Sequence, residues 1–152
     1  MALLVGVACC GYSLRALLPP HLKTISVQPV ENQTIKPGLD VSMTNLLVQD
    51  FERDGSLRIT DLSRADVVLR CRVTNYEKSP QTYSGNQEVT TWRIGLEAKV
   101  DAQDQVKSQS LLNGTVPVSV TYDAATETEE LGIDRAVTKL SAEIVRRTLI
   151  AW

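Results

Sequence analysis

The sequence predicts an α+β fold: a two-layer sandwich in which two helices pack on one face of a mixed, mostly antiparallel sheet of about four strands. Two segments, 39–54 and 128–149, carry apolar residues at helical spacing. Three segments, 67–79, 89–101 and 115–122, alternate apolar and polar residues. Strands with one apolar and one polar face are typical of a sheet that is covered on one side only. Because strands and helices form one compact series, they are expected to share a single core.

Length and composition agree with one globular domain. The chain has 152 residues, of which 43% are hydrophobic, 22% charged and 5% aromatic. Leu and Val must therefore supply most of the core. The net charge of −2 argues against a dedicated nucleic-acid binder, because such proteins gain affinity mainly from Lys and Arg on phosphates. We find no internal repeat and no linker that would indicate a second domain.

Two adjacent cysteines follow a short apolar run at the N-terminus. A disulfide between Cys9 and Cys10 would be strained, and a zinc site needs a second ligand pair that the sequence does not offer. Residues 1–9, MALLVGVAC, instead resemble the end of a bacterial lipoprotein signal peptide, with the start codon placed late or the chain truncated. Cys10 is then the lipidated residue. The alternative is a buried N-terminal strand. Cys71 is expected to be a small buried apolar residue.

Three parts follow along the chain. Residues 1–9 are the signal-peptide remnant, residues 10–22 a lipidated tether, and residues 23–152 the folded domain. Two consecutive prolines, Pro19 and Pro20, prevent regular structure in the tether. His21 is the single histidine and is expected to be solvated there.

The first half of the domain predicts a strand, a loop and a helix. Residues 23–30 alternate as a strand does, and residues 31–38 form a loop that ends in Pro-Gly. A helix begins near Leu39 and ends at Gly55, where a left-handed cap is expected. A short strand follows at 57–61. One apolar stripe runs along the helix: Leu39, Met43, Leu46, Leu47 and Phe51.

The three long strands each have an apolar row and a polar row. Pro117 lies in the polar row of the last strand, which suits a sheet edge because proline cannot donate to a ladder. The connections are a flexible loop at 78–86 and a hairpin tip at 102–105. The apolar rows are Leu69, Cys71 and Val73; Trp92, Ile94, Leu96, Ala98 and Val100; and Val116, Val118, Val120 and Tyr122.

The last helix should run from about Thr128 to Leu149. Thr126 and Glu129 suit a capping box, and acidic residues at the start and arginines near the end match the helix dipole. We expect Leu46 of the first helix and Leu140 of the second to be core residues that face the sheet. The apolar stripe of the second helix is Ile133, Val137, Leu140 and Ile144.

No motif in the sequence indicates catalysis, a metal or a cofactor, so we expect a protein that is not an enzyme. A triad would depend on His21 in the tether, and no phosphate-binding or metal motif occurs. The uncovered face of the sheet carries Arg70, Arg72, Arg93 and Lys99. It is either an ordinary solvated face or a docking face for a partner or an anionic ligand, since Arg binds phosphate in bidentate fashion.

Four segments together resemble a known family, the LptE lipopolysaccharide-assembly lipoproteins. Cys-Gly-aromatic-x-Leu-Arg at the lipidated cysteine is the most specific of the shared features. The resemblance implies helices packed on a small sheet, an outer-membrane lipoprotein that faces the periplasm, and a partner, the β-barrel LptD, whose lumen it plugs while lipopolysaccharide enters the outer leaflet. The segments are CGYSLR at 10–15, LPPHLKTISVQPVENQT at 18–34, PGLDVSMTNLLVQDFERDG at 37–55 and ADVVLRCRVTNYEKSP at 65–80.

The chain departs from the family pattern at the ligand loops. The resemblance implies lipopolysaccharide contact by basic residues between the middle strands and before the last helix. Here the corresponding stretches, QTYSGNQ at 81–87 and DAATETEE at 123–130, have no cation. Lys78 and Arg93 flank the first stretch and are the substitutes we consider.

A second resemblance gives an alternative function. ISVQPVENQT at 25–34 is similar to the first strand of TolB amino-terminal domains and of lipoproteins that build secretion channels or activate peptidoglycan synthases. Under that alternative the protein is a periplasmic lipoprotein without a barrel partner.

Overall fold

The computed structural model describes residues 18–150 and confirms an α+β fold with two helices on a mixed sheet. The expected count of about four strands is wrong, because six strands form the sheet. The two shortest contain two residues each, too few for alternation to reveal them. In chain order the elements are β1 (Thr24–Val27), β2 (Glu31–Asn32), α1 (Leu39–Asp54), β3 (Arg58–Ile59), the 3₁₀ turn η2 (Leu62–Arg64), β4 (Val67–Tyr83), β5 (Val89–Asp104), β6 (Gln109–Asp123) and α2 (Glu129–Ile150).

The sheet has a parallel part and an antiparallel part. Strand order is β3-β1-β4-β5-β6, with β2 pairing beside β1 on β4. The short strands run parallel: β1 to β3 and to β4, and β2 to β4. The long strands β4, β5 and β6 are antiparallel neighbours. The sheet is therefore less dominated by antiparallel pairing than the sequence predicts, although its two longest pairings are antiparallel.

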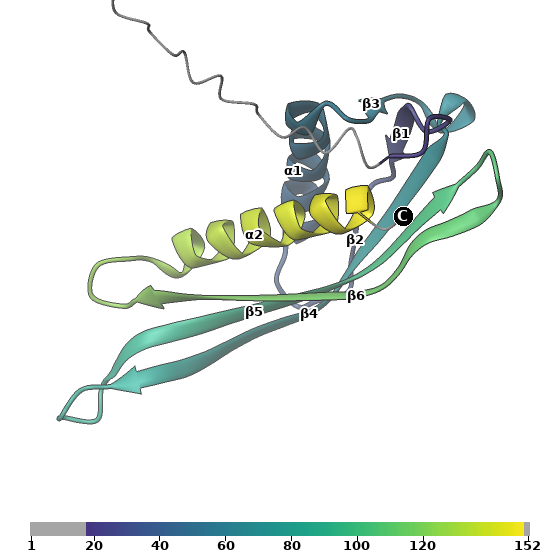
Figure 1. The fold of residues 1–152 in the computed structure, drawn as a ribbon. Helices are drawn as coiled ribbons and strands as arrows, with labels where there is room; N and C mark the ends of the chain where they lie inside the picture. Colours follow the sequence, from purple (N-terminus) through teal and green to yellow (C-terminus); the bar gives the residue numbers. More distant parts are fainter. Residues whose placement is uncertain (1–17, 151–152) are drawn as a thin grey trace, which may run out of the picture.

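Both helices lie on the same face of the sheet (Figure 1). The predicted stripes bury Met43, Leu47 and Leu140 completely, at 0% exposure each. The expectation for Leu46 is only partly met, because its side chain is half-buried at the margin of the core. Leu47 takes the central position, one residue further around the helix.

Local signals set the helix ends. Gly55 adopts φ 70° and its N–H donates to the Phe51 carbonyl at 3.0 Å, which confirms the predicted left-handed end of α1. The capping box predicted for α2 is wrong. The helix begins at Glu129, and the Thr128 hydroxyl, rather than that of Thr126, accepts the Leu131 N–H at 3.4 Å.

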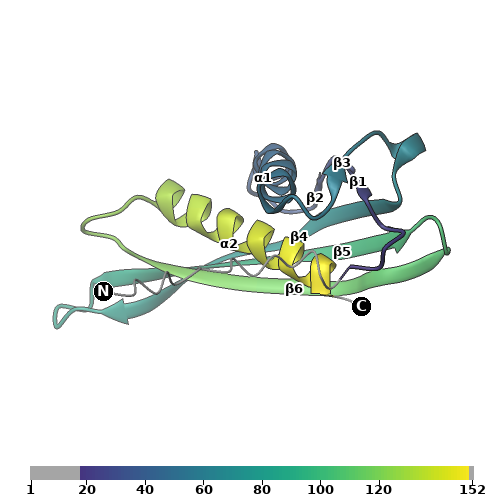
Figure 2. The same ribbon diagram turned by 45° about the horizontal axis from the view of Figure 1, so that its top comes forward.

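The middle hairpin is longer than the sequence predicts. The segment 78–86 is largely strand, since β4 continues to Tyr83 and β5 begins at Val89. Figures 1 and 2 both show this hairpin reaching beyond α2 at one end of the molecule. The register between β4 and β5 shifts between Val73 and Asn75, so Thr74 is an extra residue that forms a β-bulge.

β6 is an edge strand, as Pro117 predicts. The outer edge of β6 is covered by side chains from α2. Arg135 donates to the Thr121 carbonyl at 3.0 Å, and Lys139 donates to the Ser119 carbonyl at 3.0 Å. These donors satisfy main-chain groups that no further strand pairs, which protects the edge against association.

The prediction that His21 is solvated is wrong. Its Nε2 lies 2.7 Å from Asp104 Oδ2, and the Asp104 side chain is 2% exposed. Leu22, the next residue, is buried in the core. The domain contacts therefore begin before residue 23. Residues 1–9 and Cys10 lie outside the described residues. Within 18–150, neither helix combines the length and the apolar character that a membrane span requires.

Candidate functional site

The uncovered face of the sheet holds a compact group of cations. Arg70, Arg72 and Lys99 are all exposed and come from β4 and β5. In the register of this pair, Arg72 lies opposite Lys99 and Arg70 lies opposite Asp101. Like charges directly opposite each other destabilise a sheet. We call these three residues, with the neighbouring carboxylates Glu31 and Asp101, the basic patch.

Two carboxylates partly neutralise the basic patch. Glu31 of β2 accepts from Arg72 Nε at 2.6 Å, and Asp101 Oδ2 lies 3.8 Å from Arg70 Nη1. A shallow groove of about 190 Å³ passes between these residues. Asp101 Oδ1 is buried and has no hydrogen-bond partner within the described chain. Lys99 has no ion pair with any described residue, so the patch retains one uncompensated cation.

Arg93 lies on the same face as the basic patch but at a separate position. It pairs with Ser79 of β4 and Thr121 of β6, six residues along β5 from Lys99. Arg93 lines a groove of about 670 Å³ together with Glu77 and Glu97, and this groove extends over β6 to α2. The four cations predicted for the uncovered face thus lie on it at two sites, with Glu97 between them along β5.

Lys78 lies on the opposite, helix-covered face. It pairs with buried Ile94, and its ammonium sits 4.6 Å from the ring centre of Trp92 and 5.9 Å from that of Tyr122. The bulge at Thr74 explains this placement. Odd-numbered β4 residues face the helices before the bulge, and even-numbered residues face them after it.

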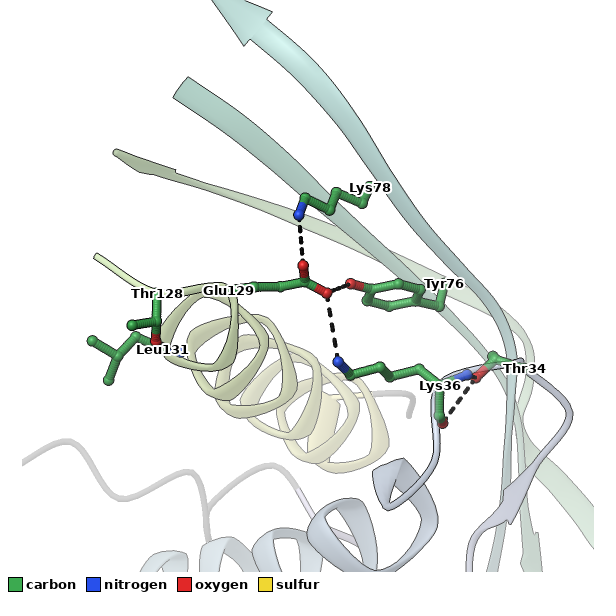
Figure 3. Close-up of polar contacts among 7 residues, drawn as sticks. All are labelled: Thr34, Lys36, Tyr76, Lys78, Thr128, Glu129 and Leu131. Atoms are coloured by element: carbon green, nitrogen blue, oxygen red, sulfur yellow. Dashed lines mark hydrogen bonds and ion pairs between the residues drawn. The ribbon is translucent and has the colours of Figure 1, made fainter. Parts of the chain in front are cut away.

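Glu129 collects three donors at the start of α2 (Figure 3). Lys78 Nζ lies 2.5 Å from Glu129 Oε2, while Tyr76 Oη donates to Oε1 at 2.8 Å. Lys36, from the loop before α1, approaches Oε1 at 3.5 Å. We call these four residues the Glu129 cluster. It ties together α2, the middle hairpin and the loop that leads into α1.

The contacts within this cluster determine which of its groups are charged. Hydrogen bonds from Lys78 and then Tyr76 lower the pKa of Glu129 from 4.5 to about 2. The bond to Glu129 raises the pKa of Lys78, and burial followed by the Glu129 contact raises that of Tyr76. Glu129 and Lys78 are therefore charged and Tyr76 is neutral at pH 7. An anionic ligand would have to compete with Glu129 for the Lys78 ammonium.

The sequence predicts a binding role for Lys78 but does not reveal the residues that contact it. It predicts a capping role for Glu129 and a core position for Trp92. Tyr76 and Lys78 are two positions apart and therefore share one face of β4, but only the bulge at Thr74 makes it the helix-covered face. Cys71 is buried as predicted, and burial raises the pKa of its thiol to about 12. Among residues 18–150, His, Cys, Asp and Glu side chains form no group that could hold a metal.

Comparison with known proteins gives a family match over most of the chain. The model of the LptE family, described as lipopolysaccharide-assembly, matches residues 22–148. No curated protein sequence matches the chain.

Solved structures share the fold at low sequence identity. A hypothetical protein from Chlamydia trachomatis aligns with a TM-score of 0.65 at 9% identity, over 84% of this chain and 96% of that one. Lipoprotein B from Nitrosomonas europaea aligns with a TM-score of 0.57 at 10% identity, over 96% and 89%. A lipoprotein from Neisseria meningitidis aligns with a TM-score of 0.51 at 15% identity, over 82% and 96%. At such identities these likenesses concern the fold alone.

Proposed function

This chain belongs to the LptE lipopolysaccharide-assembly family, and from that premise we propose that it is an outer-membrane lipoprotein that plugs the LptD β-barrel and helps to insert lipopolysaccharide into the outer leaflet. The observation that carries the proposal is the family match over residues 22–148, which includes both helices up to Thr148 and all six strands. The family match does not favour the alternative of a secretion-channel or synthase-activating lipoprotein.

The proposal places the protein on the periplasmic side of the outer membrane, held by a lipid on Cys10. Several proteins of the same fold carry the name lipoprotein, which supports this anchoring. Mass spectrometry of the mature N-terminus, with the upstream reading frame included, tests it. A protein extracted from membranes with residues 1–9 intact would contradict lipidation at Cys10.

We assign the barrel-docking role to the uncovered face of the sheet. Its basic patch and Arg93 project from long, paired strands, so they are held more firmly than residues on a loop. Lys99 and Arg93 have no ion pair with any residue in the described part of the chain, which leaves both available to a partner carboxylate or phosphate. Lys78 is less available, because Glu129 occupies its ammonium.

A pull-down of LptD, together with lipopolysaccharide binding, tests this assignment. Arg70→Glu combined with Arg93→Glu should weaken barrel association, with the wild-type interaction itself weakening in added salt. The control is Gln81→Glu with Asn86→Asp, which adds negative charge to the tip of the middle hairpin instead. Loss in the control alongside normal binding by the sheet variant would move the docking site to the hairpin.

A further inference from the structure

A small cationic cleft lies at the end of the molecule opposite the β4–β5 turn. The cleft has a volume of about 370 Å³ and is lined by Leu22, Lys23, Gly55, Ser56 and Arg58. Both cations line the cleft, and the Arg58 N–H donates to the Lys23 carbonyl at 2.9 Å, which joins their main chains beside the β1–β3 pairing. Neither side chain forms an ion pair within residues 18–150. Ser56 Oγ is buried there and has no hydrogen-bond partner in the same part of the chain.

The acidic residues around the cleft are mostly engaged elsewhere. Asp66 Oδ2 accepts the N–H groups of Lys23 and Thr24, both at 2.9 Å, and Asp61 pairs with Arg64 at 2.7 Å. Asp54 accepts the Ser56 N–H at 3.0 Å and is the acid beside the cleft. Two cations and a hydroxyl without a partner are the groups that bind a phosphate oxygen.

Exposed apolar side chains occur at the same end. Leu62 of η2 is 52% exposed and Val106 of the β5–β6 turn is 58% exposed. Figures 1 and 2 both place η2 and this turn at the end away from the β4–β5 turn. The Gln105 N–H donates to the Asp66 carbonyl at 2.7 Å, which joins the turn to the start of β4. Exposed apolar side chains among cations are typical of surfaces that lie in the headgroup region of a membrane.

The N-terminal segment reaches the domain at this end as well. His21 contacts Asp104 at 2.7 Å, and the Leu22 N–H donates to the Pro19 carbonyl at 3.0 Å. If Cys10 carries the lipid, as the proposed function has it, Leu18 lies eight positions after the anchor. Such a segment spans at most about 30 Å when fully extended. The cleft end is thus kept near the bilayer, whereas the middle hairpin can extend away from it.

We propose that this end of the domain is a membrane-facing surface, on which Lys23 and Arg58 bind the headgroup phosphate of an anionic phospholipid while Leu62 and Val106 enter the interface. The contact is separate from the barrel-docking face and from the covalent lipid. It orients the domain on the membrane, in addition to tethering it there.

Sedimentation with lipid vesicles tests the inference. The full chain with Cys10→Ala, which removes the proposed lipid, is mixed with vesicles of phosphatidylglycerol and phosphatidylethanolamine, or of phosphatidylcholine alone. Binding is expected to the anionic vesicles and to fall with salt. Lys23→Ala with Arg58→Ala should weaken it by about fivefold for each charge removed. Leu62→Ser with Val106→Ser should weaken the binding that remains in high salt.

The matched control is Arg135→Ala with Lys139→Ala, which removes two cations from the first half of α2 and leaves the cleft unchanged. Equal loss in this control would show a general charge effect and overturn the inference, as would unchanged binding by the cleft variant. Release of the protein from vesicles by inorganic phosphate, at an ionic strength at which sodium chloride releases none, would mean that the cleft recognises free phosphate rather than a membrane surface. LptD pull-down with the cleft variant reports on the proposed function independently.

Discussion

Charged residues have different neighbours on the two faces of the long antiparallel sheet. On the covered face, the Glu129 cluster gives the Lys78 ammonium a carboxylate at 2.5 Å and an aromatic ring at 4.6 Å. On the uncovered face, Arg72 and Lys99 lie directly opposite each other, and Lys99 has no ion pair with a described residue. Charges on the covered face therefore stabilise the fold, whereas the like charges that lie opposite each other on the uncovered face lower its stability.

Core truncation should give the largest contrast between the faces. Leu140→Ala removes a side chain that is 0% exposed under α2 and should lower the free energy of unfolding by about 2–5 kcal/mol. Arg70→Ala on the uncovered face should change it by less than about 0.5 kcal/mol. Chemical denaturation of both variants measures the contrast. Leu46→Ala should fall between them, because Leu46 is only half-buried; a loss as large as that of Leu140→Ala would contradict the observed helix phase.

The Glu129 cluster should give the next largest effect, and it depends on pH. Glu129→Gln should lower stability at pH 7 by about 1–2 kcal/mol, because two partly exposed lysines lose their carboxylate. The folded-state pKa of about 2 lies below the ordinary 4.5, so Glu129 stabilises the fold above about pH 4.5 and this contribution is lost as the pH falls towards 2. The difference between wild type and Glu129→Gln should therefore shrink through that range in acid titrations of unfolding.

Glu143→Gln is the control for the pH experiment. Arg146 and then Arg147 lower the pKa of Glu143 to about 2 as well, so it titrates in the same range. This carboxylate joins residues of one helix only and does not connect α2 to the sheet. The Glu143→Gln variant should therefore retain the contribution of Glu129 to the free energy of unfolding. Parallel stability curves for wild type and Glu129→Gln between pH 4.5 and 2 would show that the cluster does not stabilise the fold.

The comparison also shows what the sequence can predict. Helical stripes and Gly55 predict α1 well, because spacing and a left-handed cap are local properties. The alternation in β5 correctly places Arg93 and Lys99 on one face. The placement of Lys78 could not be predicted, since one extra residue at Thr74 exchanges the two faces of β4, and nothing in the local sequence requires a bulge there. The contact between His21 and Asp104 joins residues 83 positions apart, which no local pattern reveals.

The smallest predicted effect is the repulsion within the basic patch. A double-mutant cycle of Arg72→Gln and Lys99→Gln isolates the energy between these two residues from the contact of Arg72 with Glu31. We expect an unfavourable coupling of about 0.2–1 kcal/mol, as for like charges directly opposite in a sheet. It should decline with added salt, because both side chains are exposed. A favourable or salt-independent coupling would mean that Glu31 and Asp101 already neutralise the patch. The basic patch would then have no unpaired charge available to a partner, and the contrast between the two faces would disappear.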